Sequence, residues 1–181
     1  MSRVELVEPS NAATEVKPVL DEITAAFGTT PAMFKAVANS PAALEMMWGA
    51  FGALGGGRLG AKLGEQVAVL VADRNSCEYC LAAHTALGRK AGASAHEMRE
   101  AQAGRSEEAR TAAALAFVEK LVRERGQVGD DDVEALRAVG LDDEDVVELV
   151  AHVALNLFTN YVNVALDVPV DFPRVALLDA R

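Results

Sequence analysis

The residues best suited to chemistry in this sequence are two cysteines and a histidine, Cys77, Cys80 and His84. They lie on a predicted helix that Asn75 or Ser76 is expected to cap, which places both thiols in its first turn. Unpaired backbone N–H groups and the positive end of the helix dipole favour the thiolate form there. The three side chains fall within roughly 60° of arc, and His84 follows Cys80 at the spacing at which helical side chains meet. A dithiol backed by an imidazole can lose protons, attack and close to a disulfide, so the pattern predicts redox chemistry.

Other interpretations of the two cysteines stay open at this point. Cysteine is often an inert buried residue of small size. The pair could also be half of a zinc site that His84 and one carboxylate complete, although structural zinc sites usually bring a second CxxC or an HxxxH, and the sequence has neither. A thioredoxin-like fold is excluded, because its CxxC follows a strand and no strand is predicted here.

Glu65 is a further candidate, 12 residues before Cys77 in the opening turns of an apolar predicted helix. An acid in the first turn of a helix often serves the helix dipole alone. A short break between helices at residues 74–77 would instead fold Glu65 back beside the dithiol. In that apolar setting its carboxylate would have a raised pKa and could accept a proton from a cysteine.

The last long predicted helix repeats this layout at an offset of 83 residues. There Glu148, Asn160 and Asn163 take the places of Glu65, Cys77 and Cys80. We interpret this as a degenerate internal duplication whose second copy is redox-inert. Together with His152 and Asn156, the two asparagines also form a polar stripe on one face of an apolar helix. Such a stripe needs partners, which could be the dithiol or a subunit interface, and buried structural hydrogen bonding is favoured.

Helix signals recur along the whole chain and predict an all-α fold. They include a capping box at Ser94 and Glu97 and a run of acids at the start of the last helix. Helices are expected near 15–27, 31–39, 41–54, 61–75, 77–91, 95–103, 107–125, 130–139 and 143–166. We expect one domain over residues 1–181, a helical bundle with half-repeats at about 41–92 and 124–175.

Composition excludes several classes of function. Apolar residues make up 51% of the 181 residues, enough for a substantial core. Basic residues number 17 against 27 acidic ones, a net charge of −10, which argues against nucleic acid and anionic membranes as partners. No signal peptide or membrane span is predicted, so we expect a cytoplasmic protein.

The motif Glu65-x11-Cys77-x-x-Cys80-x-x-x-His84 in an all-helical chain resembles the alkylhydroperoxidase D (AhpD) branch of the carboxymuconolactone decarboxylase superfamily. The stretch from about 54 to 92 carries the motif, and with the asparagine-containing tail the resemblance covers roughly residues 40–175. It implies an all-α bundle with an internal repeat that assembles as a homo-oligomer, a trimer or a hexamer. In AhpD a further histidine immediately precedes the second cysteine, where this chain has Tyr79.

The resemblance also implies roles for the candidate residues. Cys80 would be the thiolate that attacks a hydroperoxide and forms a sulfenic acid, although the helix dipole alone would favour Cys77. Cys77 would relay the proton and then close the disulfide, and Glu65 and His84 would complete the proton relay, with a water. A thiol peroxidase or disulfide reductase of this kind needs a dithiol electron donor, for which lipoyl proteins and peroxiredoxins are the implied partners. Nothing in the sequence requires a metal, haem or flavin cofactor.

Two other functions remain as alternatives. One is a lyase or isomerase of the decarboxylase branch that acts on a lactone or related small cyclic acid. That branch does not depend on a CxxC, so the motif counts against this function. The other is a non-catalytic oligomeric or metal-binding module.

Overall fold

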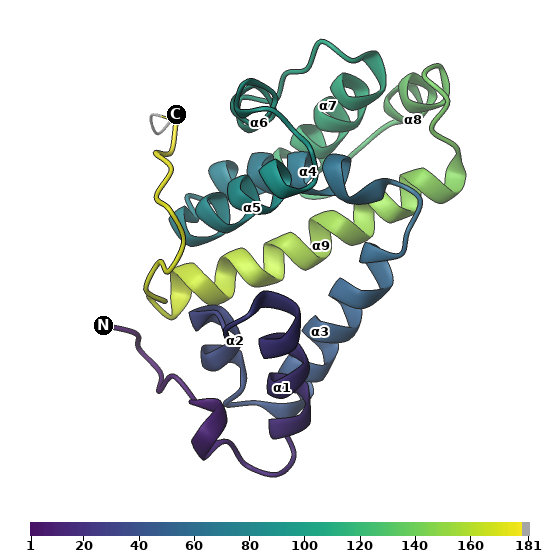
Figure 1. Cartoon of the computed structure of the whole chain (residues 1–181). Coiled ribbons are helices and arrows are strands. Elements are labelled where there is room, and N and C mark those ends of the chain that lie inside the picture. The colour runs from purple at the N-terminus through teal and green to yellow at the C-terminus, as the bar shows by residue number, and fades with distance from the viewer. Residues whose placement is uncertain (179–181) are drawn as a thin grey trace.

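The computed structural model describes residues 1–178, and within them every regular element is helical, which confirms the predicted all-α fold (Figure 1). Among the described residues, a short 3-10 helix at Pro9–Asn11 precedes nine α-helices. These are α1 (Lys17–Phe27), α2 (Ala32–Val37), α3 (Pro41–Gly55), α4 (Gly60–Arg74), α5 (Glu78–Lys90), α6 (Ala95–Gln102), α7 (Ala109–Arg123), α8 (Asp130–Arg137) and α9 (Asp143–Ala165). None of the described helices has the length and hydropathy that a membrane crossing requires.

Helices α4 and α9 form the centre of the molecule. Helix α4 packs against α5, α6, α7 and α9, and its residues 66–72 are all buried. A surface helix has one apolar face and one exposed polar face. The seven consecutive buried residues therefore show that α4 is a core helix. On the other side of α9 lie α2 and α3, with α1 packed against them (Figure 1).

The reversal between α4 and α5 is made by a left-handed residue, Ser76, with φ 54°. The N–H of Cys77 donates to the carbonyl of Ala72 at 2.9 Å, and the N–H of Ser76 donates to the carbonyl of Asp73 at 3.0 Å. This pair of bonds is the Schellman arrangement that ends many helices. It turns the chain back within three residues, so that α5 runs along α4.

The two halves of the predicted internal repeat follow different helix paths after their first 14 matched residues, 61–74 and 144–157. Residues 61–74 and their counterparts 144–157 are helical in both halves. Beyond them α4 ends and the chain reverses, whereas α9 continues without a break to Ala165 and is followed by a tail without helices over 166–178. The half-repeats at 41–92 and 124–175 stay a prediction, which superposition of the two halves would test.

An aromatic cluster joins the first three helices. The ring of Phe34 on α2 lies 5.6 Å from Phe27, 5.9 Å from Trp48 and 6.0 Å from Phe51, measured between ring centroids. Tilted and edge-on aromatic pairs at these distances stabilise a packed layer. The cluster forms one wall of the candidate site.

Candidate active site

Cys77 and Cys80 lie at the start of α5 and are paired as a disulfide, with their Cα atoms 5.4 Å apart. The predicted cap is wrong: the residue before the first turn of α5 is Cys77 itself, and its Sγ accepts a hydrogen bond from the N–H of Cys80 at 3.2 Å. Ser76 cannot take this position because it forms the left-handed turn. Both cysteines are almost fully buried, with 1% and 2% of their surface exposed, so a reactant must reach them through a cavity.

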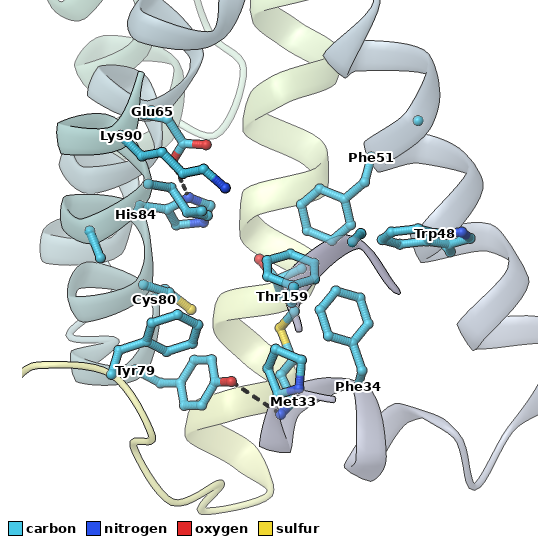
Figure 2. Close-up of a pocket in the computed structure, with 18 residues that line it drawn as sticks. Met33, Phe34, Trp48, Phe51, Glu65, Tyr79, Cys80, His84, Lys90 and Thr159 are labelled. Atoms are coloured by element: carbon cyan, nitrogen blue, oxygen red, sulfur yellow. Dashed lines mark hydrogen bonds and ion pairs between the residues drawn. The ribbon is translucent and has the colours of Figure 1, made fainter. Parts of the chain in front are cut away.

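Glu65 and His84 form a hydrogen-bonded pair beside the dithiol. Glu65 Oε2 and His84 Nδ1 are 2.7 Å apart, and both side chains are largely buried. The pair joins α4 to α5 because the tight reversal brings the two helices together. Figure 2 shows His84 above Cys80 on the same helix, with Glu65 above the imidazole and hydrogen-bonded to it. Three of the four candidate residues, Cys80, His84 and Glu65, border one cavity.

This cavity has a volume of about 580 Å³ and is mainly apolar. Four of the six phenylalanines, the single tryptophan and one of the two tyrosines line it. They are Phe27, Phe34, Trp48, Phe51, Tyr79 and Phe172. We refer to it as the aromatic cavity (Figure 2). Its wall was missed at the sequence level, where the only signal was that three of these aromatics fall between residues 34 and 51.

Two asparagines of α9 face the dithiol region. Asn163 Nδ2 donates to Cys80 Sγ at 3.2 Å. One turn earlier, Asn160 Oδ1 accepts from Asn75 Nδ2 at 3.1 Å, which ties α9 to the α4–α5 reversal. The polar stripe therefore serves the dithiol region through both residues. An N–H that points at sulfur favours the thiolate over the thiol.

Tyr79, which stands where AhpD has a histidine, is a fixed side chain of the start of α5. Its hydroxyl accepts a hydrogen bond from the backbone N–H of Met33 at 3.3 Å, and its ring packs edge-on against Phe172 with centroids 5.7 Å apart. Burial raises the pKa of Tyr79 above its ordinary value, with the Asp171 carboxylate as a further cause. The phenol therefore stays neutral and links α5 to α2 and the C-terminal tail.

His152, on α9, lies behind the Glu65–His84 pair. It borders a small cavity of about 140 Å³ together with Gly64, Glu65 and His84. Gly64 favours this close approach, because a Cβ at that position would lie 3.1 Å from His152 Cε1 and the imidazole would have to shift. Burial lowers the pKa of His152, and the nearby carboxylates of Glu148 and Glu65 offset only part of this effect.

The lowered pKa of His152 predicts a pH-dependent contribution to stability. The folded protein binds fewer protons at this group than the unfolded chain does below the unfolded pKa of about 6.5. The contribution is therefore complete above that pH and is lost as the pH falls through the window below it. We expect the Tm of the wild type to fall further between about pH 7.5 and about pH 5 than the Tm of His152→Gln. Thermal melts of both proteins check this, with His96→Gln, a change at an exposed histidine, as the control that should follow the wild type.

Within residues 1–178, no three His, Cys, Asp or Glu side chains come together in a way that could hold a metal ion. The zinc alternative therefore finds no ligand set in the part of the chain that the structure describes. The Asn163 amide contacts the Cys80 sulfur, and the imidazole of His84 and the carboxylate of Glu65 border the same cavity as Cys80. An imidazole and a carboxylate can carry protons, and an amide N–H can stabilise a thiolate by a hydrogen bond.

Comparison with known proteins places the chain among proteins with this fold. Residues 41–122 match the Carboxymuconolactone decarboxylase family. A peroxidase-related protein from Silicibacter sp. TM1040 superposes with a TM-score of 0.81 at 24% identity, over 97% of this chain and 92% of that one.

A peroxidase-related protein from Ralstonia eutropha JMP134, described as an alkylhydroperoxidase AhpD core, gives a TM-score of 0.83 at 23% identity, over 94% of this chain and 92% of that one. A form of the debrominase Bmp8 in complex with 2,3,4-tribromopyrrole superposes with a TM-score of 0.78 at 18% identity, over 94% of each chain. A comparison with curated protein sequences gives no match. At these identities the structural likeness shows the fold.

Proposed function

Because residues 41–122 match the Carboxymuconolactone decarboxylase family and the chain has the fold of AhpD-like proteins, we propose that it is a thiol peroxidase that reduces organic hydroperoxides through Cys77 and Cys80. One observation carries the proposal: Cys80 borders the same apolar cavity as the hydrogen-bonded pair of Glu65 and His84. A nucleophile, a proton carrier and a space for an apolar substrate thus meet at one place.

The reaction begins with the thiolate of Cys80. It attacks the terminal oxygen of the hydroperoxide, so that a sulfur–oxygen bond forms while the oxygen–oxygen bond breaks. The leaving alkoxide takes up a proton through His84, whose imidazolium form the Glu65 carboxylate stabilises. The products are an alcohol and a sulfenic acid on Cys80.

Cys77 completes the turnover. Its sulfur attacks the sulfur of the Cys80 sulfenic acid, and hydroxide leaves and is protonated to water. Two thiols and one hydroperoxide have then become one disulfide, one alcohol and one water. The N–H of Asn163, 3.2 Å from Cys80 Sγ, is suited to hold that sulfur as a thiolate at the start of each cycle.

The proposal extends to the partners and the setting. A dithiol donor must reset the disulfide, and lipoyl proteins and peroxiredoxins are the partners that the family resemblance suggests. A cysteine pair that cycles in this way suits the reducing cytoplasm. Exposed apolar side chains on the outer face of α9, Val147, Val150 and Tyr161, support a homo-oligomer, because such surfaces mark interfaces.

Thiol titration tests the proposal directly. The fully reduced protein should show two thiols per chain, and one equivalent of cumene hydroperoxide should remove both while cumyl alcohol appears in equal amount. A titre that no hydroperoxide changes would contradict the proposal. The lyase alternative, which does not use the dithiol, would then become the better explanation of the fold.

A second candidate function is the reductive removal of a halogen from a small aromatic ring. It is supported by the six aromatic side chains around Cys80 and by the likeness to a debrominase, since aromatic walls stack well on a flat ring. Bromide release from 2,3,4-tribromopyrrole by the reduced protein measures it. The candidate is rejected if Cys80→Ser releases bromide as fast as the wild type does.

A further inference from the structure

The two cysteines border different cavities. Cys80 lines the aromatic cavity, and Cys77 does not. Cys77 lines a second cavity of about 350 Å³ between the start of α5, the end of α9 and the C-terminal tail, and Cys80 does not border it. We call this space the tail cavity. Its lining includes Asn163, Val170 and Arg174.

Tyr79 borders both cavities and stands between them. Its ring is held from two directions, by the hydrogen bond from the N–H of Met33 and by the edge-on contact with Phe172. In Figure 2 the Tyr79 side chain lies below Cys80 and points its hydroxyl toward Met33. An anchored phenol ring at this position separates the approach to Cys80 from the approach to Cys77.

We infer that the two half-reactions use the two cavities separately: the hydroperoxide meets Cys80 in the aromatic cavity, and a small dithiol reductant meets Cys77 in the tail cavity. This inference rests on the proposed function and assigns a binding site for its second substrate. In this arrangement the Tyr79 side chain forms the wall between the two cavities and keeps the two substrates apart.

The chemistry of the reduction fits attack at Cys77. A thiolate of the reductant attacks Cys77 Sγ, a mixed disulfide forms, and the bond between Cys77 and Cys80 breaks. Cys80 leaves as a thiolate, which is the form that the N–H of Asn163 stabilises. The second thiol of the reductant then attacks the first sulfur of the reductant, which is bonded to Cys77, and Cys77 is released as a thiolate. The reductant loses two electrons and two protons and becomes a disulfide, and the protein regains two thiols.

The burial of Cys77 limits which reductants can reach its sulfur. Cys77 is 1% exposed, so a thiol fixed on the surface of a folded domain would not reach its sulfur, which argues against the peroxiredoxins among the donors proposed above. Val168, Pro169 and Val170 line the cavity together with mainly polar surface, and Arg174 Nη1 lies 3.8 Å from Glu78 Oε2 at the exposed rim. A small dithiol that carries polar groups suits this lining.

Mapping a mixed disulfide tests which sulfur the reductant attacks. The disulfide form is mixed briefly with glutathione, quenched in acid and alkylated, and the peptide that contains both cysteines is sequenced by mass spectrometry. We expect glutathione on Cys77 and the alkyl group on Cys80. Glutathione on Cys80 would overturn the inference.

Two bulky substitutions test the two cavities. Val170→Trp narrows the tail cavity, and Ala86→Trp narrows the aromatic cavity, which Ala86 lines. We expect Val170→Trp to slow reduction of the disulfide by dithiothreitol about tenfold or more and to leave oxidation by cumene hydroperoxide within about twofold of the wild type. Ala86→Trp should show the reverse pattern. If both variants slow the same half-reaction, the cysteines share one entrance and the inference is wrong.

The reductive half-reaction can be measured without any hydroperoxide, because diamide also oxidises a dithiol to its disulfide. If the wild type fails to consume hydroperoxides, the proposed function is wrong, yet the reduction of diamide-treated Val170→Trp still decides whether dithiothreitol enters through the tail cavity. An unchanged rate in that variant, together with a circular-dichroism spectrum like that of the wild type, would remove the tail cavity from consideration.

Discussion

Cys80→Ser is expected to lower the rate of hydroperoxide consumption by about a thousandfold or more. The proposed mechanism begins with a thiolate, and a serine hydroxyl does not ionise near neutral pH. The change is close to isosteric, and Asn163 Nδ2 can donate to the serine oxygen as it does to the sulfur, so we expect the fold to be retained. Steady-state peroxide consumption, with a thermal melt to check folding, measures the effect.

Cys77→Ser is the matched control, because it removes the other sulfur of the same pair. In this variant the first step should proceed once and stop at a sulfenic acid on Cys80, which dimedone labels and mass spectrometry locates. A sulfenic acid that forms only in Cys80→Ser would reverse the two roles. The pair of variants also decides between two physical influences on the thiols.

These influences oppose each other at the start of α5. The helix dipole acts most strongly on Cys77, at the N-cap. The N–H of Asn163 and the neighbouring Glu65–His84 pair act on the Cys80 side. If dimedone labels Cys80 in Cys77→Ser, the local hydrogen bonds outweigh the dipole, as the mechanism requires.

Local signals were sufficient to predict the helices that hold the candidate residues. The expected helices at 61–75 and 77–91 agree with α4 and α5 to within one residue at each end. Ends of helices depend on capping and on residues with special backbone preferences, and both act over a few positions. The local error at the site itself, the cap of α5, arose because Ser76 is used for the left-handed turn and leaves Cys77 as the cap.

The remainder of the site depends on contacts between distant segments. The hydrogen bond from Asn163 to Cys80 joins residues 83 positions apart, and helical spacing fixes only which side chains share a face, not what that face meets. The tail is a further example. Asp171 Oδ2 accepts a hydrogen bond from the N–H of Ala32 at 2.6 Å, and Phe172 packs on Tyr79, so an irregular segment supplies part of the cavity wall.

Glu65→Gln is expected to lower the rate of hydroperoxide reduction by about ten- to a hundredfold, and His84→Ala by about a hundredfold or more. Glutamine can keep the hydrogen bond to His84 Nδ1, in which Glu65 Oε2 lies 2.7 Å from the nitrogen. It carries no negative charge, however, and cannot stabilise an imidazolium as the carboxylate does. The loss should therefore fall on the proton-transfer step. Rates measured across the pH range check this, because the pH profile of Glu65→Gln should differ in shape from that of the wild type.

Glu148→Gln is the matched control for Glu65→Gln, since Glu148 is the counterpart of Glu65 in the predicted repeat. Its carboxylate accepts hydrogen bonds from the backbone N–H groups of Arg58 and Leu59, just before α4. The change should lower stability by about 1 kcal/mol, as the loss of a helix cap does, and should leave the turnover rate of the folded protein unchanged. An equal loss of rate in both variants would mean that Glu65 acts through the position of α4 and not through its charge.

The double variant Glu65→Gln/His84→Ala decides whether the pair acts as one unit. If the carboxylate works only by stabilising the imidazolium, removal of the imidazole already removes its effect, and the double variant should be no slower than His84→Ala alone. If the two losses multiply, Glu65 has a separate contact with the reacting groups, either with Cys80 or with the leaving oxygen. Multiplication would then place the carboxylate, and not only the imidazole, at the hydroperoxide in the aromatic cavity.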